Sequence, residues 1–145
     1  MSYFLDRNRN GFSIDCVFLT CFQDEWRAIA TLLQYGGIRS HRAETTEQAD
    51  FLLTVTGGTV LLTDAIFLDG CWNDALRMCA QLHPCVSTFV IADSIDSAFV
   101  SEALDRGACG TFTKPLSILK AQKLIHLADE AARDRRCNQA FSTAR

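Results

Sequence analysis

Five short strand-like runs alternate with segments of helical periodicity along this chain. Most of these runs are apolar and rich in β-branched residues, as is typical of strands buried on both faces of a sheet. The second run carries two arginines, which suit an exposed edge strand. The runs cover residues 15–21, 38–43, 59–64, 88–92 and 110–113. Strands that alternate with helices through short connections predict one parallel sheet with helices on both faces.

The segments between these runs repeat apolar residues at three- and four-residue steps, which is the period of an amphipathic helix. Two of them begin with a capping signal. Thr45 precedes Gln48 by three residues, and Asp96 or Ser97 precedes the fourth segment. The predicted helices cover 24–34, 45–57, 72–82, 96–106 and 116–136.

The composition predicts one domain located in the cytoplasm. A length of 145 residues, 48% of them hydrophobic, supports a single core. The net charge of −3 provides no basic surface for nucleic acid. No apolar run reaches the roughly 20 residues of a membrane helix, and the N-terminus has no signal-peptide core, so we expect no membrane contact. We predict an irregular lead-in over 1–14, the domain over 15–136 and a polar tail over 137–145.

The seven cysteines are odd in number and form no C-x-x-C pair. Most lie in apolar runs, so we expect reduced, buried thiols that pack as small hydrophobic side chains. Redox chemistry at Cys21, near a predicted strand end, is one alternative. A metal site is another, although its candidate ligands lack the tight paired spacing of zinc sites. These candidates are Cys71, Cys79, His83 and Cys85.

The third predicted strand ends on a carboxylate. It runs over 59–64, from threonine through valine and two leucines to Asp64. In an open parallel sheet, ligands and chemistry collect at the carboxyl ends of the strands. Asp64 is therefore the first candidate for a functional side chain.

Residues 103–115 resemble the end of the receiver domain of bacterial two-component response regulators. In that family a Gly-Ala pair follows the fourth helix, and a Lys-Pro pair follows the fifth strand, with the lysine seven residues after the glycine. Gly107 and Lys114 keep this spacing, and Asp64 ends the third strand. The resemblance covers roughly 15–136 and implies a chemotaxis-regulator-like, flavodoxin-like α/β fold. This fold is a three-layer sandwich in which five helices cover a five-stranded parallel sheet of order 2-1-3-4-5.

The resemblance implies roles for three residues at the sheet edge. Asp64 corresponds to the aspartate that accepts a phosphoryl group from a phosphohistidine, with Mg²⁺ bound beside it. Lys114 corresponds to the lysine that contacts the phosphoryl oxygens, and its bond to Pro115 is a candidate cis peptide. We also expect Lys114 to lower the pKa of Asp64, and the simplest role of the pair is a structural ion pair without chemistry.

Other positions of the family's site are changed in this chain. The acidic pair that holds Mg²⁺ is replaced by Cys21 and Phe22, and the fourth-strand hydroxyl is replaced by Ala92. Neither a thiol nor a phenyl ring suits Mg²⁺, which takes oxygen ligands in octahedral geometry. Thr111 stands where the family often has an aromatic switch residue. The resemblance therefore implies a receiver whose metal site has been lost.

We predict a degenerate receiver domain that signals through protein–protein contacts, without the usual Mg²⁺-dependent aspartyl phosphorylation and without a metal or other cofactor. Its predicted partner is a histidine kinase, a phosphotransfer protein or an output protein. A homodimer through the fourth helix, the fifth strand and the last helix is an alternative assembly. That surface comprises roughly 96–106, 111–113 and 117–132.

Two alternatives remain open. In the first, Asp24 or Glu25 at the start of the first helix replaces the lost Mg²⁺ ligands, and Asp64 is a working phosphoacceptor. The favourable effect of acidic side chains at a helix start is the simpler explanation for both. In the second, the cysteines build a redox or metal-binding protein. No Gly-rich phosphate loop, nucleophile elbow or Ser/His/Asp arrangement indicates a stand-alone enzyme.

Overall fold

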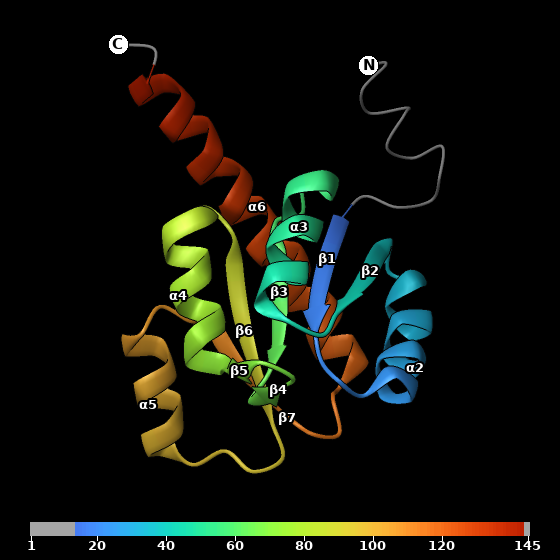
Figure 1. The fold of residues 1–145 in the computed structure, drawn as a ribbon. Coiled ribbons are helices and arrows are strands. Elements are labelled where there is room, and N and C mark those ends of the chain that lie inside the picture. Colours follow the sequence, from blue (N-terminus) through green and yellow to red (C-terminus); the bar gives the residue numbers. More distant parts are fainter. Residues whose placement is uncertain (1–13, 144–145) are drawn as a thin grey trace.

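Five parallel strands form the central sheet. The computed structural model describes residues 14–143. The strands are β1 (Ile14–Leu19), β2 (Ile38–Ala43), β3 (Val60–Asp64), β6 (Ser87–Ala92) and β7 (Gly110–Thr113). They lie in the order β2-β1-β3-β6-β7, and all neighbours are parallel (Figure 1). The predicted order 2-1-3-4-5 is thereby confirmed, with β3 at the centre of the sheet.

Helices cover both faces of this sheet (Figure 1). Over the described residues they are α2 (Gln23–Gln34), α3 (Thr46–Thr56), α4 (Trp72–Leu82), α5 (Ser97–Asp105) and α6 (Ile118–Thr143). Side chains of α2 and α6 pack against one face, and those of α3, α4 and α5 pack against the other. The protein is therefore the predicted three-layer, flavodoxin-like sandwich. None of these helices combines the length and the apolar character needed to span a bilayer.

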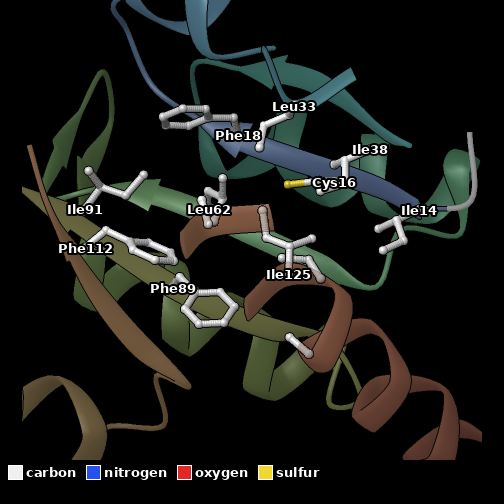
Figure 2. Close-up of a cluster of buried hydrophobic side chains, with 13 residues drawn as sticks. Ile14, Cys16, Phe18, Leu33, Ile38, Leu62, Phe89, Ile91, Phe112 and Ile125 are labelled. Atoms are coloured by element: carbon white, nitrogen blue, oxygen red, sulfur yellow. The ribbon is translucent and has the colours of Figure 1, made fainter. Parts of the chain in front are cut away.

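The strands supply both halves of the core, because successive side chains of a strand point to opposite faces of the sheet. Cys16, Phe18 and Leu62 belong to the face covered by α2 and α6, whereas Val17 and Leu61 belong to the opposite face. Figure 2 shows the first of these clusters, with Leu62 between the side chains of β1 and those of β6 and β7. The central strand thus contributes fully buried leucines to both sides.

Capping side chains define the starts of two helices where the sequence predicts them. The Thr45 hydroxyl accepts a hydrogen bond from the Gln48 N–H at 3.1 Å. The Gln48 side chain accepts a hydrogen bond from the N–H of Glu44. In a standard capping box this side chain would accept from the N–H of the N-cap residue itself, which here is Thr45. Asp96 is the N-cap of α5 and accepts from the Phe99 N–H at 2.8 Å. These bonds satisfy N–H groups that the helices leave without partners.

Replacing Asp96 with alanine is expected to lower the free energy of unfolding by about 1 kcal/mol, because the Phe99 N–H loses its acceptor. Urea denaturation followed by circular dichroism measures the change. Ser101→Ala is the matched control, since Ser101 is exposed inside the same helix and alanine has the higher helix propensity. Equal destabilisation by both substitutions would contradict the assigned cap.

A small hairpin follows β3, where the sequence predicts a loop. Its strands, β4 (Ile66–Phe67) and β5 (Gly70–Cys71), pair antiparallel near the end of β3 (Figure 1). A Cβ atom at Gly70 would lie 2.5 Å from Asp74 Oδ2, so a side chain there would require the Asp74 carboxylate, which accepts from the Cys71 N–H, to move. Strands of two residues are too short to show the alternating pattern that reveals a strand in a sequence.

The last helix is longer than predicted. α6 continues to Thr143, so the prediction that this helix ends at residue 136 is wrong. No glycine or proline precedes Thr143 in this segment, and polar residues alone do not end a helix. Arg135 also ties the helix to the rest of the domain, since it donates to the Cys85 carbonyl at 3.0 Å.

Candidate functional site

Asp64 ends β3 with its carboxylate buried at the carboxyl edge of the sheet. The residue is only 2% exposed. Its Oδ2 accepts a hydrogen bond from the Thr20 hydroxyl at 2.5 Å. Its Oδ1 has no hydrogen-bond partner within the described part of the chain. Asp64 is therefore a half-satisfied buried carboxylate, an arrangement that is costly unless a cation lies nearby.

Thr20 is a site residue that the sequence prediction missed. β1 ends at Leu19, two residues earlier than predicted, and the Thr20 hydroxyl accepts a hydrogen bond from the Phe22 N–H at 3.1 Å. Leu19 lies opposite Thr63 in the register of β1 and β3, which places the next residues, Thr20 and Asp64, side by side. The predicted sheet order already contained this signal, because neighbouring parallel strands end at the same edge.

Lys114 connects several parts of the site. Its Nζ lies 3.5 Å from Asp64 Oδ1 and 3.2 Å from Glu25 Oε1. It also lies 5.1 Å from the centre of the Phe22 ring, which is within cation–π range. The peptide bond to Pro115 is cis, as the resemblance implies. The ammonium group is thus shared by two carboxylates and an aromatic face.

Burial raises the pKa of Asp64, and this effect outweighs the Thr20 hydrogen bond and the Lys114 charge, which both lower it. Lys114 therefore lowers the pKa of Asp64 as predicted, but desolvation of the carboxylate exceeds the attraction of the ammonium, and the pKa is raised overall. Burial also opposes the charged form of Lys114. There, however, Asp64 and Glu25 outweigh it, and the pKa of Lys114 is raised.

An open pocket of about 310 Å³ lies beside the Asp64 carboxylate. Three positions that the resemblance marks as altered, Cys21, Phe22 and Ala92, all line it. Ile66 of the β4–β5 hairpin lines it too. The pocket therefore presents hydrocarbon and sulfur at positions where the family has oxygen ligands.

The remaining candidate residues lie in different surroundings. Asp24 is exposed in the first turn of α2 and does not line the pocket, whereas the neighbouring Glu25 reaches Lys114. Asp93 is exposed and lines the pocket. Thr111 lies in β7 away from it. Of the two predicted substitute carboxylates, Glu25 is the one that the structure brings to the site.

The Mg²⁺ ion of the family does not fit the side chains at this site. Magnesium takes oxygen ligands in near-octahedral geometry. Phe22 and Cys21 supply none, and Glu25 Oε1 already contacts Lys114. Among the residues that the structure describes, no three His, Cys, Asp or Glu side chains form a group that suits a metal ion. Asp64 Oδ1 alone is a poor substitute for that ligand set.

The seven cysteines are all free thiols. Cys16, Cys79 and Cys85 are buried, and burial raises the pKa of Cys16 to about 12 and that of Cys79 to about 11. Thiols with such pKa values are poor nucleophiles and metal ligands. Three other cysteines are exposed, so the prediction of buried thiols is wrong for them. These are Cys21, Cys109 and Cys137.

Comparison with known proteins finds this fold among solved structures. No family model and no curated protein matches the chain. The receiver domain of Francisella response regulator 1452 superposes with a TM-score of 0.74 at 16% identity, over 81% of this chain and 98% of that one. A response regulator receiver domain protein from Clostridium thermocellum superposes with a TM-score of 0.71 at 17% identity, over 88% of this chain and 99% of that one. NtrX from Brucella abortus superposes with a TM-score of 0.75 at 19% identity, over 90% of this chain and 29% of that one.

These similarities agree with the features of the sheet and its edge. The strand order is that of the flavodoxin-like fold, and Asp64 ends the central strand. Identities this low establish a shared architecture, while chemistry has to be argued from the side chains present. The chain therefore has the fold of the receiver domain of response regulators.

Proposed function

We propose that this chain is a degenerate receiver domain, which acts in signal transduction through protein–protein contacts and is not switched by Mg²⁺-dependent aspartyl phosphorylation. The observation that carries the proposal is the engagement of Lys114. Its ammonium group contacts both Glu25 and Asp64, so its charge is already balanced before any phosphoryl group arrives. Phe22 and Cys21 supply no oxygen ligand that would bring a metal to the pocket.

Phosphoryl transfer to Asp64 would add negative charge to a site that already holds too little positive charge. The transition state spreads charge over three equatorial oxygens of the phosphoryl group. Enzymes stabilise such charge with preorganised donors and cations, and the loss of one such donor costs about 3–4 kcal/mol. The raised pKa of Asp64 also works against the carboxylate form that attacks phosphorus. Both effects favour a module that is not phosphorylated.

The proposed partners are a histidine kinase, a phosphotransfer protein or an output protein in the cytoplasm. The proposed contact surface consists of α5, β7 and α6, by analogy with the fold. Leu104 of α5 and the α6 residues Leu119 and Leu127 are exposed on these helices, and exposed apolar side chains suit contact with another protein. We assign the chain no enzymatic activity of its own.

Incubation with Mg²⁺ and acetyl phosphate is expected to leave the intact mass of the protein unchanged. Mass spectrometry after an acid quench detects an aspartyl phosphate if one forms. A receiver domain that retains its acidic pair, treated in parallel, shows that the donor is active. A mass increase of one phosphoryl group that Asp64→Asn abolishes would refute the proposal.

A second candidate function is favoured by the position of Glu25. In this alternative, Asp64 is phosphorylated and Glu25, whose Oε1 lies 3.2 Å from Lys114 Nζ, supplies the missing carboxylate. It predicts a phosphoryl adduct in the unmodified protein and none in Glu25→Gln. Asp24→Asn is the matched control, because Asp24 is the exposed neighbour on the same helix. Adduct formation that depends on Glu25 but not on Asp24 would replace the first candidate by this one.

A further inference from the structure

The outer face of α6 carries basic side chains in its first half and acidic side chains in its second half. Lys120 and Lys123 are exposed near the start of the helix, and Glu130 and Asp134 are exposed about two turns further along. Leu127 lies between the two pairs and is 53% exposed. The face is therefore split into a positive and a negative half, with one leucine at the boundary.

These five side chains form one stripe, which we call the charged stripe, on the side of α6 that points away from the sheet. Lys120, Leu127 and Asp134 follow one another at seven-residue steps, and Lys123 and Glu130 keep the same step. Seven residues make about two turns of an α-helix, so residues at this spacing lie on the same side. The buried side of the helix, which faces the sheet, includes Ala121, Ile125, Ala128 and Ala132.

Helix α2 contacts α6 along a different side. The Gln122 side chain donates to the Leu32 carbonyl at 3.2 Å, and the His126 ring bonds to the Gly36 carbonyl at 2.8 Å. Neither Gln122 nor His126 belongs to the charged stripe. The stripe is therefore exposed to solvent in the single chain, because the sheet and α2 lie on other sides of the helix.

Within one chain the stripe brings like charges together. Glu130 and Asp134 are four residues apart, and Lys120 and Lys123 are three apart, so the members of each pair are neighbours on the helix surface. Neighbours of like charge destabilise a helix. None of the four side chains forms an ion pair with another residue that the structure describes. The single chain thus leaves both pairs uncompensated.

A second copy of α6 that runs in the opposite direction compensates both pairs. In an antiparallel pair centred on Leu127, a residue seven positions before the centre faces the residue seven positions after it. Lys120 then faces Asp134 of the second copy, and Lys123 faces Glu130 of the second copy. Two-fold symmetry repeats each contact, so all the charges of the stripe are matched. A parallel pair would instead place like charges opposite each other.

We propose that this protein forms a two-fold symmetric homodimer through the charged stripes of two antiparallel α6 helices. Leu127 packs against Leu127 of the second copy at the axis, and opposite charges meet on both sides of it. The inference deepens the proposed function, on which it rests for the role of α6 in protein contacts, because it identifies a second copy as the partner. It differs from the homodimer that the resemblance implies, which also uses α5 and β7.

Charge is the main attraction in this contact. Leu127 is the one apolar side chain of the stripe, so little hydrophobic surface is buried, and the charges set orientation and register. A contact of this kind is weak, so the dimer dissociates at the low protein concentrations of a denaturation experiment. In sedimentation equilibrium at low salt, we expect the average mass to rise with concentration toward that of a dimer. At about 1 M salt, where the Debye length is about 3 Å, we expect the monomer.

Charge reversal tests the pairing directly. The variant Lys120→Glu/Lys123→Glu makes the stripe negative throughout, and the variant Glu130→Lys/Asp134→Lys makes it positive throughout. Each variant alone is expected to self-associate at least about tenfold more weakly, because like charges then face each other. An equimolar mixture is expected to associate again, since every facing pair is then opposite in charge. All four residues are exposed, and circular dichroism verifies that both variants fold.

Leu127→Glu tests the axis of the dimer. It places two carboxylates where the helices meet and is expected to weaken self-association at least about tenfold. Leu104→Glu is the matched control, because it is the same change at an exposed leucine of α5, and it is expected to leave self-association unchanged. The reverse order of the two effects would place the contact on α5 and overturn the proposal.

Three other results overturn the proposal as well. The first is a protein that stays monomeric at every concentration at low salt. The second is self-association that persists unchanged in both charge-reversed variants. The third is a mixture of the two folded variants that fails to associate.

These results are separable from the phosphorylation experiment, because none of the variants changes Asp64. A protein that gains no phosphoryl group and stays monomeric keeps the proposed function and loses this inference. A protein that is phosphorylated on Asp64 loses the proposed function, whatever its oligomeric state. Self-association through α6 without phosphorylation supports both.

Discussion

Leu62→Ala is expected to lower the free energy of unfolding by about 3–5 kcal/mol. Leu62 is fully buried in β3, which lies between β1 and β6. It packs in the cluster shown in Figure 2, whose side chains come from all five strands of the sheet and from α2 and α6. Truncation leaves a cavity, because a strand hydrogen-bonded on both sides cannot move to fill it. Urea denaturation at neutral pH measures the change.

Leu119→Ala is the matched control for this prediction. It is the same substitution in the same protein, but Leu119 is 81% exposed on α6. We expect a change within about 0.5 kcal/mol, since exposed side chains make few contacts that are lost. If Leu62→Ala lowers the free energy of unfolding as little as Leu119→Ala does, the assignment of Leu62 to the centre of the core is wrong.

Lys114→Met is expected to lower the free energy of unfolding at neutral pH by about 3 kcal/mol. Methionine keeps an aliphatic side chain but lacks the ammonium group, so Asp64 stays buried without its cation and Glu25 loses its ion-pair partner. Lys123→Met on the exposed side of α6 changes the net charge by the same amount and serves as the control. Equal effects of the two substitutions would show that the ion pair does not stabilise the fold.

The pH dependence of this loss separates charge from packing. The pKa of Asp64 in the folded protein lies above its usual value of 3.8, so the folded state holds this proton more readily than the unfolded state. The stability that this group contributes is therefore complete below pH 3.8 and is lost as the pH rises through the folded pKa. Lys114→Met removes a charge that lowers this pKa. We therefore expect its deficit in stability to grow from about pH 4 to about pH 7.

Asp64→Asn in the Lys114→Met background tests the cause of the deficit. Asparagine still offers Thr20 an acceptor but carries no charge, so the double variant is expected to recover much of the lost stability at neutral pH. Recovery assigns the loss to the uncompensated carboxylate. A deficit that is independent of pH and persists in the double variant would assign it to packing around the lysine stem.

Most of the fold was predictable because each element shows its own period within a short stretch of sequence. The third strand and the first helix are examples, predicted over 59–64 and 24–34 and found at Val60–Asp64 and Gln23–Gln34. The parallel topology then follows, since short connections restrict how such units join. The β4–β5 hairpin and the end of α6 were not predictable in this way. Two-residue strands have no measurable period, and α6 meets no helix breaker before Thr143.

The site was predictable in part. Asp64 follows from its place at a strand end, and Lys114 from the resemblance of residues 103–115 to receiver domains. The same resemblance indicates Cys21 and Phe22, both of which line the pocket. Each of these residues lies at or just after the carboxyl end of a predicted strand, and in a parallel sheet these ends meet at one edge.

The sequence by itself determined the alternation of strands and helices, and its resemblance to receiver domains indicated the order of the strands and the pairing of Asp64 with Lys114 at one edge of the sheet. Only the tertiary structure decided what surrounds that pair. Thr20 occupies one oxygen of Asp64, and Glu25 takes a share of the lysine's charge. Burial then raises the pKa of the carboxylate that the lysine alone would lower. Desolvation depends on everything packed around a group, so no local pattern in the sequence reports it.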